Sequence, residues 1–117
     1  MPPRLRHVVE FVADMDRAIR FYRDTLGLPL RTESPEWSEF STGEITLVLR
    51  LASEANPPGT LQLGFSSPDL PAACQALVQR GVRFTQPPTR TDDGSMMAEF
   101  LDSEDARCSI GETSRTP

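Results

Sequence analysis

His7 is the single histidine of the 117-residue chain, and its chemistry constrains function more than that of any other residue. It lies in the stretch RLRHVVEFV, whose alternating pattern is typical of a β-strand. An imidazole there can ligate a metal, move a proton, or line a binding site through hydrogen bonds. No Cys-His or Ser-His arrangement at a supporting spacing accompanies it, and the sequence has no Gly-rich phosphate loop. A nucleophilic hydrolase is therefore not expected.

The elements that position His7 come in two similar runs. The first run predicts a strand over residues 5–12, followed by a helix that Asp14 caps and Gly27 ends. Three strands are expected next, over residues 30–33, 37–41 and 45–51. The helix carries one apolar stripe, expected to face the core: Met15, Ala18, Ile19, Tyr22 and Leu26.

The second run begins after residues 52–59, a linker rich in small, polar and Pro residues. A strand is expected over residues 60–66, then a helix capped by Asp69, and then short strands over residues 82–85, 95–102 and 107–111. Residues 86–94 are expected to form a loop.

An internal duplication relates the two runs. An offset of 55 positions superposes the caps Asp14 and Asp69 and pairs His7 with Gln62. A rival offset of 54 pairs His7 with Leu61 but does not superpose the caps. We expect a single domain over residues 1–112, built of repeats 4–51 and 60–111 joined by the linker, with residues 113–117 as a frayed tail.

Two motifs carry a family resemblance: HVVEFVADMDRAIRFYRDTLGLPL and AEFLDSEDARCSI. With the duplication, they make the chain similar to the vicinal oxygen chelate superfamily, which includes glyoxalase I, extradiol dioxygenases and bleomycin-resistance proteins. The resemblance implies an α+β fold of two tandem βαβββ modules that form a half-open barrel with a concave crevice, and helices packed outside. It also implies a homodimer with the ligand in the crevice, and it leaves open whether modules are exchanged between chains.

The resemblance further implies four metal-ligand positions, two in each module. They fall on His7, Val48, Gln62 and Ser109, so two of the four lack a usual ligand. A divalent ion needs several converging N or O donors, often including a carboxylate. We therefore expect no metal cofactor. If a metal (Zn, Ni, Mn or Fe) is bound, His7 and Gln62 are its candidate ligands.

Two further residues are expected near the ligand. Trp37 begins a strand that lines the crevice in the resembled family, where its ring can stack on a ligand or pack in the core. Arg50 shares the strand parity of Val48 and can point inward, whereas Glu10 falls on the face opposite His7. The expected ligand-binding set is His7, Gln62, Trp37, Val48, Ser109 and Arg50.

The charge and composition of the chain limit the kinds of partner that it is expected to bind. The net charge of −5 argues against nucleic acid, and no apolar run is long enough for a membrane span. Cys74 and Cys108 lie in apolar patterns as buried thiols do, which favours a cytoplasmic location.

The favoured function is metal-independent binding or sequestration of a small organic molecule. The alternative is a metal-dependent lyase or dioxygenase of the glyoxalase type, using a depleted site around His7 and Gln62. Metal-free catalysis with His7 as acid or base also stays open.

Overall fold

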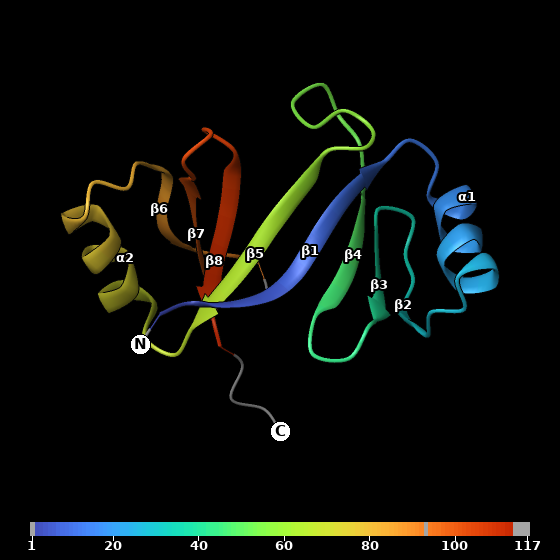
Figure 1. Ribbon diagram of the computed structural model, residues 1–117, viewed down its shortest axis with the longest axis horizontal. Helices are drawn as coiled ribbons and strands as arrows, with labels where there is room; N and C mark the ends of the chain where they lie inside the picture. Colours follow the sequence, from blue (N-terminus) through green and yellow to red (C-terminus); the bar gives the residue numbers. More distant parts are fainter. Residues whose placement is uncertain (1, 93, 114–117) are drawn as a thin grey trace. The chain divides into compact units, whose positions relative to one another are not determined.

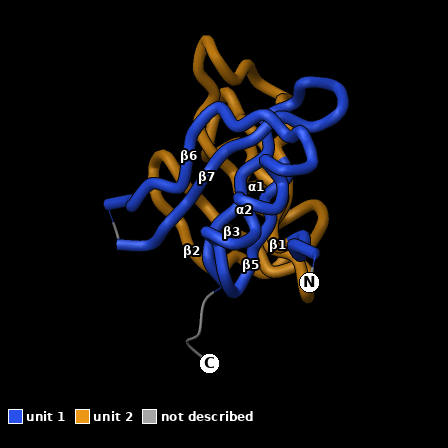
Figure 2. The backbone as a smooth tube through the Cα atoms, turned by 90° about the vertical axis from the view of Figure 1, so that its left-hand side faces the viewer, with its two compact units in different colours: residues 1–5, 63–117 blue, residues 6–62 orange. Residues whose placement is uncertain are grey.

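The computed structural model describes residues 2–92 and 94–113 (Figure 1). These residues belong to two compact units (Figure 2). The first unit comprises residues 6–62, and the second comprises residues 1–5 together with residues 63–117. Residues 114–117 of the predicted frayed tail, and Asp93 of the predicted loop, lie outside the described residues.

The first unit is a βαβββ module. Its elements, in chain order, are β1 (Arg4–Val12, of which the first two residues belong to the second unit), α1 (Met15–Arg20), the π-helix η1 (Phe21–Thr25), β2 (Leu30–Thr32), β3 (Trp37–Ser41) and β4 (Thr46–Leu51). The strand order is β2-β3-β4-β1, with β1 parallel to β4 and the other neighbours antiparallel.

The second unit repeats this plan. It contains β5 (Leu61–Ser67, starting two residues before the unit), α2 (Leu70–Gln79), β6 (Phe84–Arg90), β7 (Met96–Leu101) and β8 (Arg107–Glu112). The strand order is β5-β8-β7-β6, with β5 parallel to β8. The predicted α+β fold of two βαβββ modules is confirmed, and in each unit the helix packs on one face of the strands.

The helix caps form as the sequence predicts. The carboxylates of Asp14 and Asp69 accept hydrogen bonds from the backbone N–H groups of Arg17 and Ala72, each at 3.1 Å. An N-cap carboxylate satisfies a backbone donor that the first turn leaves without an intrahelical partner.

No helix among the described residues is long and apolar enough to cross a membrane.

The predicted apolar stripe of the first helix is wrong at its last residue. The helix widens into the π-helix η1, in which the N–H of Leu26 donates to the carbonyl of Phe21. The extra residue in this turn rotates the following side chains, so Leu26 is 55% exposed while Ile19 is 2% exposed. The rest of the stripe packs on Phe40 and Leu49, as predicted.

The predicted loop over residues 86–94 is also wrong in its first half. Strand β6 extends to Arg90 and includes Pro87 and Pro88. β6 is the last strand in its sheet order, and its pairing with β7 shifts register between Gln86 and Thr89, so the two prolines fall where the ladder is interrupted. The core of this unit lies between α2 and its strands and includes Leu70, Cys74 and Ile110.

Candidate functional site

One face of the first unit gathers four of the six predicted site residues. The register between β1 and β4 places these residues together: His7 lies opposite Thr46, Val9 opposite Val48, and Phe11 opposite Arg50. On the other side of β4, Glu39 lies opposite Val48, and Trp37 lies opposite Arg50. Because side chains alternate along a strand, these residues share the face opposite α1. We call it the β1–β3–β4 face: His7, Val9, Phe11, Trp37, Glu39, Ser41, Thr46, Val48 and Arg50.

Two aromatic rings hold Arg50 on this face. Its guanidinium carbon lies 5.4 Å from the centre of the Trp37 ring and 5.7 Å from that of Phe11. Phe11 is buried, whereas Trp37 is 37% exposed. Trp37 therefore offers a ring to solvent beside a positive charge.

Glu39 is a site residue that the sequence analysis missed. Its carboxylate accepts a hydrogen bond from the indole N–H of Trp37 at 2.7 Å and lies 3.9 Å from the guanidinium of Arg31. The signal was available, because Glu39 has the parity of Trp37 in a correctly predicted strand. In the second unit, Glu99 lies opposite Ser109 and accepts a hydrogen bond from the hydroxyl of Thr85. Glu39 and Glu99 thus take corresponding places in the two repeats.

The environment of His7 favours its neutral form. Burial is the largest effect and lowers the pKa of His7 from 6.5, and the positive charge of Arg6 lowers it further. The negative charge of Glu39 opposes these effects without reversing them. At neutral pH the imidazole is therefore uncharged, so it can accept a hydrogen bond or a proton.

The other predicted site residues differ in their surroundings. Val48 is 2% exposed and packs with Val9 and Phe11. Gln62 is half-buried in β5, whose Gly64 lies opposite Ser109 in β8. Ser109 is buried. Tyr22 packs against the core on the α1 side, and Glu10 lies on that side too, as predicted.

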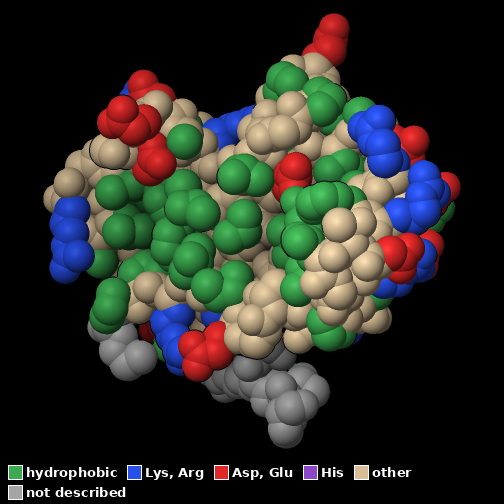
Figure 3. All heavy atoms as spheres, turned by 45° about the vertical axis from the view of Figure 1, so that its right-hand side comes forward, with side chains coloured by type: hydrophobic (Ala, Val, Ile, Leu, Met, Phe, Trp, Pro, Cys, Tyr) green, Lys and Arg blue, Asp and Glu red, His purple; other side chains and the backbone are tan. Residues whose placement is uncertain are grey.

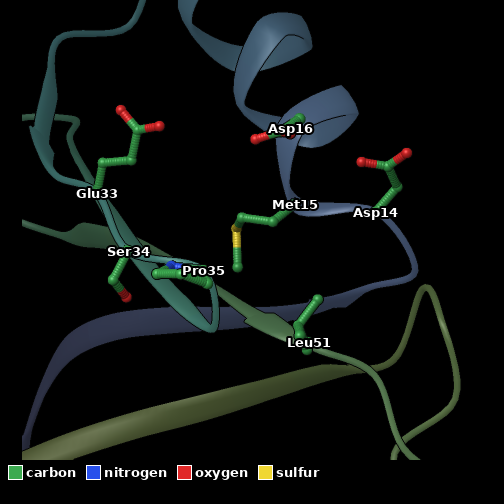
Figure 4. Close-up of a pocket in the computed structure, with 7 residues that line it drawn as sticks. All are labelled: Asp14, Met15, Asp16, Glu33, Ser34, Pro35 and Leu51. Atoms are coloured by element: carbon green, nitrogen blue, oxygen red, sulfur yellow. The ribbon is translucent and has the colours of Figure 1, made fainter.

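Two pockets, each of about 560 Å³, lie away from the predicted residues. In the first unit, one pocket is lined by the acidic residues Asp14, Asp16 and Glu33 together with Met15 and Leu51 (Figure 4). In the second unit, a groove runs along α2 beside Pro2 and Pro3. None of the six predicted site residues lines either pocket.

Known proteins share this architecture. A family model described as the Glyoxalase/Bleomycin resistance protein/Dioxygenase superfamily matches residues 4–107. The chain belongs to this superfamily. The resemblance to the vicinal oxygen chelate proteins is thereby confirmed.

Individual proteins are similar to this chain over most of its length. Lactoylglutathione lyase of Haemophilus influenzae is 27% identical over 116 residues, which cover 87% of this chain and 86% of that protein. The solved structure of methylmalonyl-CoA epimerase from Mycobacterium tuberculosis is 28% identical with a TM-score of 0.70, covering 94% and 87% of the two chains. A hypothetical protein from Bacillus halodurans has a TM-score of 0.81 at 15% identity, covers 100% and 99%, and shows the fold alone.

The residues at the four expected ligand positions do not fit the metal centre used by metal-dependent members of the glyoxalase superfamily. His7 and Gln62 offer donor atoms, but Val48 offers none, and Ser109 offers only a hydroxyl. Among residues 2–92 and 94–113, no three His, Cys, Asp or Glu side chains gather in a group that could hold a metal ion. Two neutral donors are too few to hold a divalent ion tightly.

Proposed function

We propose that this chain binds a small organic molecule on the β1–β3–β4 face and does so without a glyoxalase-type metal centre. One observation carries the proposal. Val48, which the family resemblance places at a metal-ligand position, is apolar and 2% exposed. The corresponding position in the second repeat, Ser109, lacks a carboxylate as well.

The composition of the β1–β3–β4 face supports binding. Val9, Phe11 and Val48 form a buried apolar cluster at the base of the face, and Trp37 supplies a partly exposed ring. Polar groups stand around this cluster: the imidazole of His7, the carboxylate of Glu39 and the guanidinium of Arg50. Small-molecule sites typically combine apolar walls with a few placed polar groups that orient the ligand.

A second candidate function is metal-free acid–base catalysis on the bound molecule. It is favoured because His7 and Glu39 lie on the same face of the strands. The pKa of His7 is lowered, so its imidazole is available as a base. A neutral imidazole can accept a proton from a substrate carbon next to a carbonyl, and a second group can return one. The similarity to an epimerase is in keeping with this candidate.

The metal-dependent lyase is the remaining alternative. It is supported by the 27% identity to a lactoylglutathione lyase and opposed by Val48 and Ser109. If a metal is bound, His7 and Gln62 remain its candidate ligands, and the ion would polarise substrate oxygens as a Lewis acid.

Metal titration tests the proposal directly. The wild type, His7→Ala and the exposed-residue control Arg20→Ala are each titrated with Zn²⁺, Ni²⁺, Mn²⁺ and Fe²⁺ by calorimetry. We expect all three proteins to bind each ion equally weakly. Tight binding of one ion per chain that only His7→Ala loses would overturn the proposal and favour the lyase.

We further propose a single cytoplasmic domain over residues 1–112, built of repeats 4–51 and 60–111, that works as a homodimer. Both cysteines are free and buried, in keeping with a reducing compartment. Several large apolar residues are exposed: Leu5, Phe21, Leu26, Trp37, Leu51, Leu61, Leu63, Val78 and Met97. Figure 3 shows hydrophobic side chains on the surface that it presents. Light scattering should give twice the 13.0 kDa chain mass, and the monomer mass would contradict the dimer.

A further inference from the structure

Arg50 stands out among the basic residues of the first unit because aromatic rings hold its charge. It is exposed, and its guanidinium lies against the rings of Trp37 and Phe11. No carboxylate of the described residues lies within ion-pair distance of it. Arg23 and Arg31 of this unit each have an acidic partner, whereas Arg50 is the one arginine of its described residues that lies over aromatic rings.

The acidic groups of the described residues leave Arg50 without an ion pair. The sequence has 17 acidic and 12 basic residues, so carboxylates are in excess. The carboxylate that shares the β1–β3–β4 face, that of Glu39, is directed to the indole of Trp37 and to Arg31. Since His7 is neutral at neutral pH, Arg50 is the one unopposed charge among the side chains that define this face.

The aromatic contacts prepare this cation for a ligand. A guanidinium that rests against ring faces gains cation–π attraction and loses mobility. Its N–H groups are not used by that attraction, so they stay available to a planar anion, which they can bind through two parallel hydrogen bonds. A group already held in place loses less entropy when a ligand binds.

We propose that the ligand of this protein is an organic carboxylate whose anionic group binds Arg50 and whose apolar part lies against Trp37. This assignment rests on the proposed binding function and adds the ligand's chemical class. A single unopposed positive charge matches a monoanion better than a phosphate dianion, and Glu39 on the same face disfavours the second negative charge.

Nuclear magnetic resonance can test the assignment at the site itself. Trp37 is the only tryptophan, so the chain has a single indole N–H signal, located on the β1–β3–β4 face. Four probes of similar size but different charge are titrated into the ¹⁵N-labelled protein: benzoate, benzamide, benzylamine and phenyl phosphate. We expect benzoate to shift the indole signal saturably, with a Kd about tenfold lower than that of benzamide.

Variants then connect the preference to Arg50. Arg50→Gln should raise the Kd of benzoate about tenfold and leave that of benzamide unchanged. Arg50→Lys should lose part of the preference, because it keeps the charge without the planar fork. Arg20→Gln, on the exposed side of α1, removes the same charge and should leave both Kd values unchanged. Circular dichroism establishes that each variant is folded.

Other results would overturn the proposal in distinguishable ways. Equal affinity for benzamide and benzoate, or equal effects of Arg50→Gln and Arg20→Gln, would refute the carboxylate assignment while leaving small-molecule binding intact. Tighter binding of phenyl phosphate would assign a dianion, and tighter binding of benzylamine would assign a cation; either result would refute the carboxylate assignment. If no probe shifts the indole signal saturably, both this assignment and the proposed binding face are wrong.

Discussion

The hydroxyl of Tyr22 donates a hydrogen bond to the carboxylate of Glu10 and thereby ties η1 to β1. Tyr22 also packs at 5.9 Å, ring centre to ring centre, from Phe40, which has no exposed surface. The bond therefore lies between the helix and the buried side of the strands. Glu10 stabilises the fold there and takes no part in the β1–β3–β4 face.

This pair predicts a pH effect. Burial, followed by the hydrogen bond and the charge of Glu10, raises the pKa of Tyr22 from 10 to about 12. Because the folded pKa exceeds the unfolded one, the contribution to stability is complete below pH 10 and is lost as the pH rises through 12. Tyr22 is the only tyrosine, so ultraviolet titration of its phenolate measures this pKa directly. Glu10→Gln should lower the measured value, and an unchanged value would contradict the contact.

Removing the same hydroxyl should weaken the fold. Tyr22→Phe deletes the hydrogen bond, leaves the carboxylate of Glu10 without that donor, and keeps the ring packing. We expect a loss of about 1 kcal/mol in the free energy of unfolding by urea. Glu10→Gln, which retains an acceptor, should lose less. Equal stability of Tyr22→Phe and the wild type would mean that solvent replaces the bond without loss.

His7 should titrate below its ordinary value. Its pKa is lowered from 6.5 mainly by burial, so His7 contributes stability that is fully present above pH 6.5 and is lost as the pH falls through the folded pKa. As the only histidine, it gives one set of ring signals in nuclear magnetic resonance. Glu39→Gln should lower this pKa further, and Arg6→Gln should raise it. An increase in Glu39→Gln would show that Glu39 does not act on His7 through its charge.

Trp37 should matter more for binding than for stability. It is 37% exposed, so Trp37→Ala should lose only about 1 kcal/mol of stability, whereas Phe40→Ala, in the same strand but fully buried, should lose about 3–5 kcal/mol. Binding of benzoate, followed by the relaxation of the probe's own signals, should weaken in Trp37→Ala and survive better in Trp37→Phe. Equal losses of stability in the two alanine variants would place Trp37 in the core.

The π-helix predicts that two aliphatic residues of the expected apolar stripe, Ile19 and Leu26, differ in their contribution to stability. Leu26→Ala should change stability by about 0.5 kcal/mol or less, because Leu26 is 55% exposed. Ile19→Ala should lose about 2–5 kcal/mol, since Ile19 is 2% exposed within the core. Thermal unfolding of both variants measures the difference. A comparable loss in Leu26→Ala would mean that the helix continues in regular α geometry to its end.

Local rules account for the parts of the fold that were predicted well. Asp14 and Asp69 cap their helices because a carboxylate at that position satisfies a backbone donor whatever the tertiary context. Gly27 and Gly81 follow the two helices with φ angles of +77° and +91°, where other residues are strained. The alternation of apolar residues correctly placed Glu10 on the face opposite His7.

The errors arose where long-range pairing or helix geometry overrides local preference. Pro87 and Pro88 resemble a loop, but an edge strand tolerates them. Nothing in the periodicity around Leu26 announces the widened turn of η1. The site was predicted only in part: parity placed Arg50 beside Val48, but its contact with two rings depends on the register of three strands. Glu39 has the strand parity of Trp37, but none of the expected ligand positions falls on it.

The division between the compact units lies within strands. Residues up to Leu5 belong to the second unit and residues from Arg6 to the first, so the boundary divides β1, while the sequence-predicted linker over residues 52–59 lies wholly inside the first unit. A protease that cuts in that linker would not release two complete halves. The N-terminal fragment would keep five residues that belong to its neighbour, among them Pro2 and Pro3 of the groove beside α2. We therefore expect a nicked chain to stay together as complementing fragments, and each fragment expressed alone to be incomplete.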